Sequence, residues 1–331
     1  MNRLTPPRFD TVSAYGPLLT DVELWRPFVA EVLERHGLGD VQELRAGTAG
    51  TFPTMLVADR LVVKFFGSYF DGFACAQTER ELYRLLRQDP EIPAPVIIAS
   101  GSLGDGDGKW DYIVSSQLSG TSYLTVRDRL TDANQRAAAC FVADVARRLH
   151  ALRPEVGNLR LPARDDWDAF VRRQAETCQE RHRAWGTLPD RLIDGVDEYL
   201  SPIDAMVIPA DRWSLLHGDL TADHTLGEWR DERWTPSGVI DFGDARIGDR
   251  MYELISLHIE CFDSDSGMLR AFLGHYGREA WPSGSCFARR AMSMTLLHEF
   301  DVLKTVFDRY LDARDAPSLD ALAAFLWDVD A

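Results

Sequence analysis

The feature that most constrains the fold is a short β-rich segment inside an otherwise helical half of the chain. Residues 213–249 read WSLLHGDLTADHTLGEWRDERWTPSGVIDFGDARIGD, with Asp219 and Asp241 beside short apolar runs. The run at 238–240 predicts a strand that delivers Asp241 to its end, where a carboxylate can point into a cleft. Aspartate is seldom fully buried unless it is paired. These two aspartates therefore indicate a metal, a proton to accept or a buried donor.

The segments on the two sides of this island differ in their hydrophobic pattern. Before about residue 118, strand patterns are expected over 41–66, 95–101 and 111–118, and helical patterns over 21–37 and 74–87. From about Thr121 the pattern is mostly helical, over 133–152, 165–185, 189–200, 249–277, 286–311 and 317–328. This distribution predicts an α+β fold, with a small β-rich lobe followed by a larger helical lobe.

Charge and cysteine content exclude several classes of protein. The chain has 36 Lys and Arg against 52 Asp and Glu, a formal net charge of −16. Binding to nucleic-acid phosphates needs a basic surface, so we expect no nucleic-acid partner. Five scattered cysteines without a CxxC pair indicate a reducing compartment. With no signal peptide and no stretch of about 18 apolar residues, the expected location is the cytoplasm, with no membrane partner.

Phosphoryl transfer is one chemistry that uses all of these features. It needs a carboxylate beside the attacking hydroxyl, ligands for Mg²⁺, and a lysine on the nucleotide phosphates that a glutamate holds. Lys64 lies in the apolar run LVVKFF, where a cation is costly unless it is paired. The following helix offers Glu79 and Glu81 as partners. The Gly/Thr-rich break from Gly47 to Thr51 would be the turn over the phosphates.

Two of these motifs resemble the signatures of a known family. HGDLTADHTL at 217–226 and GVIDFGDARIGD at 238–249 are similar to the HGDxxxxN and IDxxxxxxGD motifs of the aminoglycoside phosphotransferases. VVKFFG, IPAPVI, DYIVSSQLSGT, RLHAL and LLHEFDV fall in register as well, so the resemblance runs nearly end to end. In detail, the WDAF–HRAWGTLP region, ISLHIECF and LLHEFDVL are most similar to the hygromycin B 7″-O-kinase type.

The resemblance implies a bilobal protein-kinase-like fold. Its N-lobe would be residues 1–115, with N-terminal helices, a five-stranded sheet and a phosphate loop. Its C-lobe would be residues 116–331, with the catalytic loop, the metal site and the acceptor pocket. The implied cofactors are ATP or GTP and Mg²⁺, and the implied partner is a small-molecule antibiotic. The assembly is left open as monomer or homodimer.

The same resemblance assigns roles to the charged residues. Asp219 would orient or deprotonate the acceptor hydroxyl, Asp241 would bind Mg²⁺, and Lys64 would bind the phosphates. The spacing to the prolines that follow the helix favours Glu81 over Glu79 as the glutamate that holds the lysine.

Backbone contacts with the nucleotide are implied at two places. The phosphate loop, and the hinge that would bind the purine edge, comprise Gly47, Thr48, Gly50, Thr51, Ser116, Gln117 and Leu118. His217 and Asp249 match structural members of the motifs, and we expect Asp249 to cap the helix that follows it.

One position departs from the family pattern. The family's asparagine, five residues after the catalytic aspartate, is His224 here. An amide oxygen suits the hard Mg²⁺ ion better than imidazole does. Three outcomes are open: His224 binds the metal, Asp223 substitutes for it, or one metal site is weak. We hypothesise that His224 lies at the metal site and that the enzyme is active.

The acceptor is expected to bind to the helical lobe, over residues 165–200 and 258–301. Acids there would attract a cationic aminocyclitol, and a tryptophan could stack on its rings. The candidate acceptor residues are Asp219, Glu260, Asp263, Glu299, Asp301 and Trp185. The predicted function is an ATP- or GTP-dependent O-phosphotransferase that modifies a hydroxyl of a hygromycin-like aminoglycoside and confers resistance. A sugar-bearing nucleoside antibiotic (capuramycin-type) or a small metabolite is the alternative acceptor.

Two other classes remain open on the sequence. His217-x-Asp219, together with His258 or His298, matches the two-histidine, one-carboxylate triad of non-haem iron oxygenases. Those enzymes usually have an all-β barrel, whereas the flanking segments here are helical. A pseudokinase-like module would hold nucleotide or antibiotic without transferring a phosphoryl group, and His224 is the residue that supports it.

Overall fold

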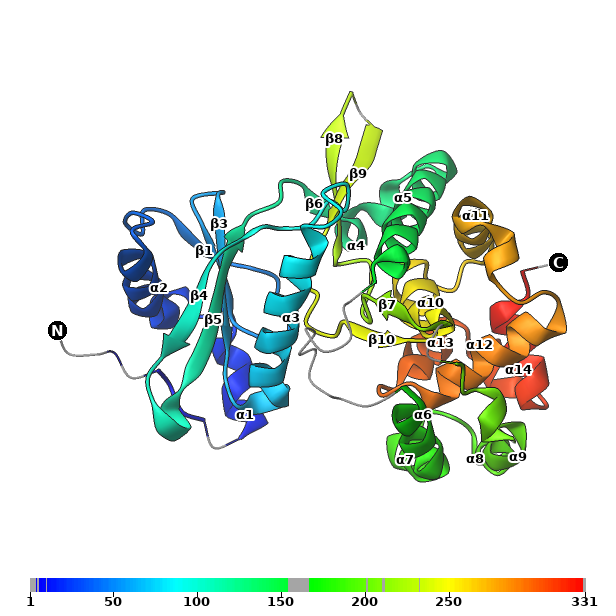
Figure 1. Cartoon of the computed structure of the whole chain (residues 1–331). Coiled ribbons are helices and arrows are strands. Elements are labelled where there is room, and N and C mark those ends of the chain that lie inside the picture. Colours follow the sequence, from blue (N-terminus) through cyan, green and yellow to red (C-terminus); the bar gives the residue numbers. More distant parts are fainter. Residues whose placement is uncertain are drawn as a thin grey trace. The chain divides into compact units, whose positions relative to one another are not determined.

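The chain divides into two units with different secondary structure (Figure 1). The computed structural model describes residues 4, 6–9, 11–153, 167–200, 202–209, 212–231 and 233–329. The first unit holds the described residues of Met1–Arg87 and Ala94–Ser119. The second unit holds the described residues of Gln88–Pro93, Gly120–Leu159 and Ala163–Ala331.

A five-stranded antiparallel sheet, in the order β1-β2-β3-β5-β4, forms the body of the first unit. Its strands are β1 (Leu44–Ala46), β2 (Thr54–Val57), β3 (Leu61–Phe66), β4 (Ile97–Leu103) and β5 (Trp110–Ser116). The predicted strand LVVKFF is β3. Its register places Lys64 opposite Thr54 of β2 and Ile113 of β5. The backbone at Lys64 is thus fixed by neighbouring strands on both sides.

The described helices of this unit are α1 (Val12–Tyr15), α2 (Val22–His36) and α3 (Gly72–Leu86), with 3-10 segments at Gly16–Leu18, Tyr69–Asp71 and Gly106–Gly108. α2 begins where the Asp21 carboxylate accepts the N–H of Leu24. It ends at Gly37, whose left-handed conformation (φ 64°) glycine adopts without strain.

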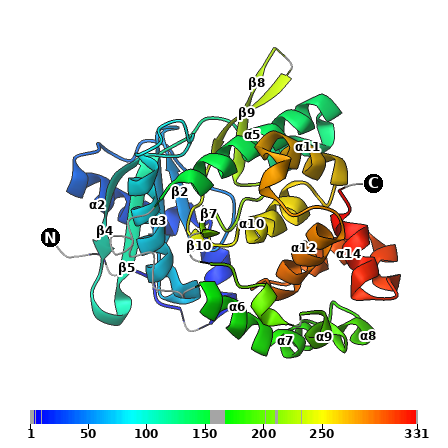
Figure 2. The same ribbon diagram turned by 45° about the vertical axis from the view of Figure 1, so that its right-hand side comes forward.

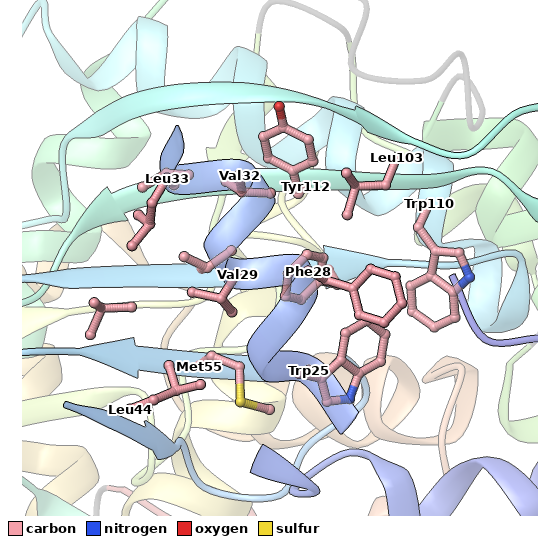
Figure 3. Close-up of a cluster of buried hydrophobic side chains, with 14 of the residues drawn as sticks. Trp25, Phe28, Val29, Val32, Leu33, Leu44, Met55, Leu103, Trp110 and Tyr112 are labelled. Atoms are coloured by element: carbon pink, nitrogen blue, oxygen red, sulfur yellow. The ribbon is translucent and has the colours of Figure 1, made fainter. Parts of the chain in front are cut away.

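Neighbouring residues of β3 pack on opposite faces of the sheet. Phe65 belongs to a cluster with Trp25 and Phe28 of α2, whereas Phe66 belongs to a cluster with residues of α3. Figure 3 shows the α2 side, where Trp25 and Phe28 lie next to Trp110. Side chains alternate across a strand, so the sheet buries one face under α2 and the other under α3. Each buried side chain of this size contributes roughly 1.5–3 kcal/mol.

The second unit is mainly helical. Its described helices are α4 (Tyr123–Val126), α5 (Asp132–Ala151), α6 (Trp167–Glu176), α7 (Cys178–Trp185), α8 (Asp190–Ile193), α9 (Val196–Tyr199), α10 (Arg250–Ser256), α11 (Ser266–Tyr276), α12 (Ser285–Leu297), α13 (Val302–Arg309) and α14 (Leu319–Trp327). Short 3-10 segments lie at Arg127–Arg129, Ile203–Ala205, Arg278–Ala280 and Leu311–Asp315. α5 and α11 lie side by side, as Figures 1 and 2 both show.

The strands of this unit bring two loops together. They are β6 (Thr121–Ser122), β7 (Ser214–Leu216), β8 (Thr225–Arg230), β9 (Arg233–Val239) and β10 (Arg246–Gly248). β7 pairs antiparallel with β10, with Leu216 opposite Arg246. The loop that follows β7 and the loop that precedes β10 therefore start from neighbouring positions. The β8–β9 hairpin connects these two loops (Figure 1).

Several predicted helical segments are broken. The described part of 165–185 forms α6 and α7, 189–200 forms α8 and α9, and 286–311 forms α12 and α13. Residues 249–277 form α10, a π-helical turn over Leu257–Cys261, and α11. Between the last two, Asp263 and Ser264 have positive φ angles of 58° and 60°, which no helix accommodates. The predicted cap is confirmed, because the Asp249 carboxylate accepts the N–H of Met251 at 2.9 Å.

The predicted α+β class is confirmed, with a small β-rich N-terminal unit and a larger helical unit. No helix in the described part of the chain has the length and apolarity that a membrane crossing requires.

Candidate active site

Lys64 forms a buried ion pair in the first unit. Its Nζ lies 3.1 Å from Oε2 of Glu79, and the two residues are only 8% and 4% exposed. The ammonium also lies over the rings of Phe52 and Phe66, 5.7 and 5.3 Å from their centroids. A cation in such apolar surroundings needs a carboxylate partner, and Glu79 supplies it.

The choice of Glu81 as this partner is therefore wrong. Glu81 pairs instead with Arg84, 2.6 Å away and one turn along the same helix. The buried face of α3 includes Ala76, Glu79 and Leu82, which recur at helical spacing. Glu81 lies outside that face, so helical periodicity was the sequence signal that favoured Glu79.

The loop predicted to cover the phosphates connects β1 and β2. Residues 48–51 are exposed, and Gly47 donates its N–H to the carbonyl of Thr54 at 2.8 Å. No backbone hydrogen bond described for this chain uses the N–H groups of Thr48, Ala49 or Gly50. A run of such N–H groups can bind phosphate oxygens.

Most of the predicted hinge is already hydrogen-bonded within the first unit. Ser116 donates its N–H to Val96 and its Oγ accepts the N–H of Val96, both at 2.9 Å. Gln117 donates its N–H to the carbonyl of Arg60, also at 2.9 Å. Of the three predicted hinge residues, Leu118 is the one whose N–H has no backbone partner among the described contacts. These bonds hold the segment extended and leave Leu118 as the candidate donor to a purine.

His217 is a fixed part of the loop after β7. It is fully buried, its Nε2–H donates to the carbonyl of Ile240 at 3.1 Å, and its Nδ1 accepts the N–H of Asp219 at 3.3 Å. Burial lowers the pKa of His217 to about 4, so the ring is neutral. Both nitrogens are in use, which contradicts the iron-triad alternative and supports the structural role expected for His217.

Glu253 of α10 anchors the same loop through its backbone. Its two carboxylate oxygens accept the N–H groups of His217 at 2.7 Å and Gly218 at 3.1 Å. Nε2 of His150 lies 3.6 Å away. Burial by itself would raise the pKa of Glu253, but His150 and these N–H donors outweigh it and lower the pKa. The sequence does not reveal this role, because the pattern of an amphipathic helix does not show which loop packs against one of its glutamates.

Asp219 and Asp241 lie on the two loops that β7 and β10 bring together. Each side chain keeps 38% of its surface exposed. Partial burial, with Asp244, Asp241 and Asp223 nearby, raises the pKa of Asp219 to about 6, although His224 acts in the opposite direction. Asp241 has a left-handed φ of 64°, unusual for a residue with a side chain and typical of functional sites.

His224 lies between these aspartates. Its Nδ1 is 2.8 Å from the carbonyl oxygen of Asp219 and 3.4 Å from that residue's carboxylate, and its Nε2 is 3.8 Å from the carboxylate of Asp241. Burial would lower the pKa of His224, but Asp241, Asp219 and Asp223 together raise it to about 9. His224 is therefore a cation at neutral pH, and it partly neutralises the acids around it.

The side chains present suit Mg²⁺ only in part. Asp241 offers hard carboxylate oxygens, the ligand type that Mg²⁺ prefers, whereas His224 offers nitrogen. Among the described residues, no group of three or more His, Cys, Asp and Glu side chains is arranged to hold a metal ion by itself. A metal at Asp241 would need further oxygen ligands from a bound nucleotide or from water.

The predicted acceptor acids are mostly engaged within the second unit. Asp263 pairs with Arg127 and Arg309, and Glu299 pairs with Arg246. These ion pairs compensate the carboxylates and reduce the anionic character expected for this surface.

Three predicted acceptor residues make neutral or aromatic contacts. Thr305 donates its hydroxyl to Oε1 of Glu260 at 2.9 Å, and Thr187 donates its hydroxyl to Asp301. Trp185 is partly exposed and packs against His182 and Arg181. Burial, together with the nearby Asp223, raises the pKa of Glu260.

Comparisons with known proteins agree with this fold. A model of the phosphotransferase enzyme family matches residues 40–287. The solved GDP and kanamycin complex of APH(2")-IIia is 18% identical, with a TM-score of 0.66 over 90% of this chain and 95% of that chain. APH(3'')-Id from Streptomyces rimosus, in complex with ADP and streptomycin, is 20% identical, with a TM-score of 0.52 over 82% and 98%. At these identities the solved structures show the fold alone.

One curated relative is described as a demethylase and not as a phosphotransferase. The lysine-specific demethylase JMJ21 of Arabidopsis thaliana is 26% identical over a match 300 positions long, which covers 74% of this chain and 31% of that protein. The chain thus spans about a third of the length of this relative.

Proposed function

Because this chain belongs to the phosphotransferase enzyme family, we propose that it transfers the γ-phosphoryl group of ATP or GTP to a hydroxyl of an antibiotic, with a hygromycin-like aminoglycoside as the first candidate. The observation that carries the proposal is the placing of Asp219 and Asp241 on two adjoining loops, on either side of His224. The nucleotides and aminoglycosides named for the similar structures support the same chemistry.

Asp219 is proposed to act on the acceptor. The hydroxyl donates a hydrogen bond to its carboxylate, which takes the proton as the oxygen attacks the γ-phosphorus. A new O–P bond forms while the bond between the γ-phosphorus and the bridging oxygen breaks, and the nucleoside diphosphate leaves. A pKa of about 6 leaves Asp219 ionised at neutral pH and still able to accept a proton. Positioning supplies most of the acceleration because the transition state is loose.

The first unit is proposed to bind the nucleotide. Lys64, held by Glu79, would contact the phosphates, and the N–H groups of Thr48 to Gly50 would cover them. Leu118 would donate its N–H to the purine. The N–H groups of Ser116 and Gln117 already donate to backbone carbonyls, so they would not bind the base. These two residues would instead hold Leu118 in place.

A metal ion is proposed at Asp241. When bound, Mg²⁺ neutralises charge on the β- and γ-phosphates. His224 occupies the family's asparagine position, and the variant His224→Asn tests its role by restoring an amide oxygen. We expect this variant to need less Mg²⁺ for half-maximal turnover. Unchanged Mg²⁺ dependence and turnover, in this variant and in His224→Ala, would remove His224 from the metal site.

Acceptor binding is proposed for the second unit, with Glu260 as the main polar contact and Trp185 as an aromatic one. The hydroxyl of Thr305 holds the carboxylate of Glu260 at 2.9 Å. Asp263 and Glu299 are compensated by arginines, which favours the second candidate, a less cationic acceptor such as a nucleoside antibiotic or a small metabolite.

A screen of acceptors tests the proposal. The purified protein is incubated with ATP or GTP, Mg²⁺ and a panel of aminoglycosides, nucleoside antibiotics and sugar-bearing metabolites. The expected result is the gain of one phosphoryl group by one class of acceptor, detected by mass, and its absence in Asp219→Asn. Nucleotide binding without transfer to any acceptor would favour a pseudokinase-like module.

A further inference from the structure

The segment before the family match contacts the loop that is proposed to cover the phosphates. The match begins at residue 40, but residues 6–9 and 11–18, here called the N-terminal arm, pack on the first unit ahead of it. Tyr15, the last residue of α1, is the arm residue that reaches the loop.

Tyr15 is held tightly at this position. It is 2% exposed, and its hydroxyl donates to the carbonyl of Thr51 at 2.8 Å. Its ring stacks on Tyr69, with centroids 5.4 Å apart, and packs against Phe9 and Trp110. A buried hydroxyl that lost its acceptor would be left unsatisfied, so the hydrogen bond to Thr51 and the packing of the ring support each other.

The loop is fixed at both ends and open in the middle. Gly47 is held through its N–H to Thr54, and a Cβ at this glycine would come within 3.3 Å of Thr54. At the other end, Tyr15 holds Thr51, and the next residue, Phe52, is buried against Phe66. Residues 48–50, whose N–H groups would face phosphate, lie exposed between these two anchors.

The second anchor also adjoins the lysine. Phe52 follows Thr51 directly, and its ring lies 5.7 Å from Nζ of Lys64. Movement of Thr51 would therefore disturb the ring that flanks the ammonium, as well as the exposed N–H groups. No other hydroxyl in the described part of the arm donates to the loop.

From these contacts we propose that Tyr15 is a positioning residue for nucleotide binding: its hydroxyl holds the loop 47–51 in the conformation that receives the phosphates. The inference rests on the proposed function, because it assumes that this loop meets a nucleotide. It adds to that function a requirement for an element that lies outside the matched family region.

The variant Tyr15→Phe tests this inference, because it removes the hydroxyl and keeps the ring. Tyr112→Phe is the matched control. Tyr112 is another 2% exposed tyrosine of the first unit, and its hydroxyl is 2.9 Å from Nε2 of His36 in α2, away from the loop. Both variants should lose thermal stability to a similar extent. Dissociation constants for ADP are then measured without acceptor, together with turnover at saturating nucleotide.

For Tyr15→Phe we expect ADP affinity to fall about three- to ten-fold, the scale of one hydrogen bond, and the KM for nucleotide to rise likewise. Turnover at saturation should change by less than about two-fold, since Tyr15 contacts no reacting group. Tyr112→Phe should keep the wild-type affinity. In the absence of ligand, hydrogen exchange over residues 48–52 should be faster in Tyr15→Phe than in the wild type or in Tyr112→Phe.

Two results would overturn the inference alone, and they can be told apart from failure of the proposed function. Equal ADP affinity in Tyr15→Phe and wild type, with unchanged exchange in the loop, leaves Tyr15 a packing residue only. An equal loss of affinity in Tyr15→Phe and Tyr112→Phe assigns the effect to general destabilisation. A wild-type protein that binds no nucleotide at all refutes the proposed function, and the inference with it.

Discussion

The two units hold their key side chains in different ways. In the first unit, the carboxylate of Glu79 lies against the ammonium of Lys64 within apolar surroundings. In the second unit, Glu253 holds the backbone of the loop that carries Asp219, through the N–H groups of His217 and Gly218. One arrangement fixes a single charged group, and the other fixes a segment of chain.

This difference has energetic consequences. A buried ion pair is sensitive to the loss of either partner, because the remaining charge stays in a medium that solvates it poorly. When a loop is held through its backbone, its conformation depends little on its functional side chains, such as that of Asp219. Substitution of Asp219 should therefore separate activity from stability in the second unit, whereas substitution of Glu79 should couple the two in the first.

The largest effect is expected for Asp219→Asn. Asparagine keeps the size of the side chain but cannot accept the proton of the acceptor hydroxyl, so turnover should fall by about 10²–10⁴-fold. Because the backbone of the loop is anchored by Glu253, nucleotide affinity and unfolding temperature should stay near those of the wild type. Steady-state kinetics, nucleotide titration and thermal unfolding check the three parts. Retained turnover would show that Asp219 does not serve as the base.

Removing Glu79 should affect both properties at once. Glu79→Gln removes a carboxylate that compensates the buried ammonium of Lys64, at a cost of about 3 kcal/mol in the free energy of unfolding. Nucleotide affinity should fall with it. Glu81→Gln is the matched control. Glu81 pairs with the largely exposed Arg84, so its loss should change stability by less than about 0.5 kcal/mol. Urea unfolding measures both.

A double variant sharpens the same test. Lys64→Met with Glu79→Leu removes both charges and should recover much of the stability lost in Glu79→Gln, because no unpaired ion remains. It should not recover nucleotide affinity. If the double variant is as unstable as the single one, the pair is held mainly by packing and not by charge.

The sequence predicted the parts of the site that depend on local pattern. The strand of Lys64 and the cap at Asp249 follow from residue order over a few positions, and both are confirmed. The choice between Glu79 and Glu81 needed the face of α3, which is set by packing on the sheet. Counting along the chain from the following prolines could not resolve it.

Contacts between distant segments were harder to predict. Arg246 and Glu299 are 53 positions apart, and nothing in either local pattern shows that they pair. The sequence therefore predicts uncompensated acids at the acceptor surface, whereas Glu299 and Asp263 are paired with arginines. The link from Tyr15 to Thr51 spans 36 positions and was missed for the same reason.

A smaller effect is expected for Glu253→Gln. The amide can accept from one of the two loop N–H groups, and its NH₂ group faces the other, which is left unsatisfied. The free energy of unfolding should fall by about 1–3 kcal/mol. Hydrogen exchange should rise at His217 and Gly218, and turnover should fall while nucleotide affinity in the first unit is kept. Unchanged exchange at these two amides would show that the anchor is not needed to fix the loop.

The smallest effect concerns acid stability, which should also differ between the units. Burial lowers the pKa values of His217, His258 and His298, all in the second unit, to about 4, whereas His36 is the one histidine in the described part of the first unit and is exposed. Between pH 6.5 and 4, these three are neutral when folded and protonated when unfolded. The unfolded state then binds more protons, so stability falls as the pH falls.

His258→Gln isolates the contribution of one of these histidines to the loss. His258 is fully buried, and its Nε2–H donates to the carbonyl of Leu326 at 2.8 Å, a bond that a glutamine amide can replace. Each such histidine contributes up to about 1.4 kcal/mol per pH unit to the slope of stability against pH. Urea unfolding at several pH values from 6.5 down to 5 should give a slope that is shallower for the variant by up to that amount. The same slope in both proteins would show that His258 is protonated in the folded state, and that acid sensitivity of the second unit has another source.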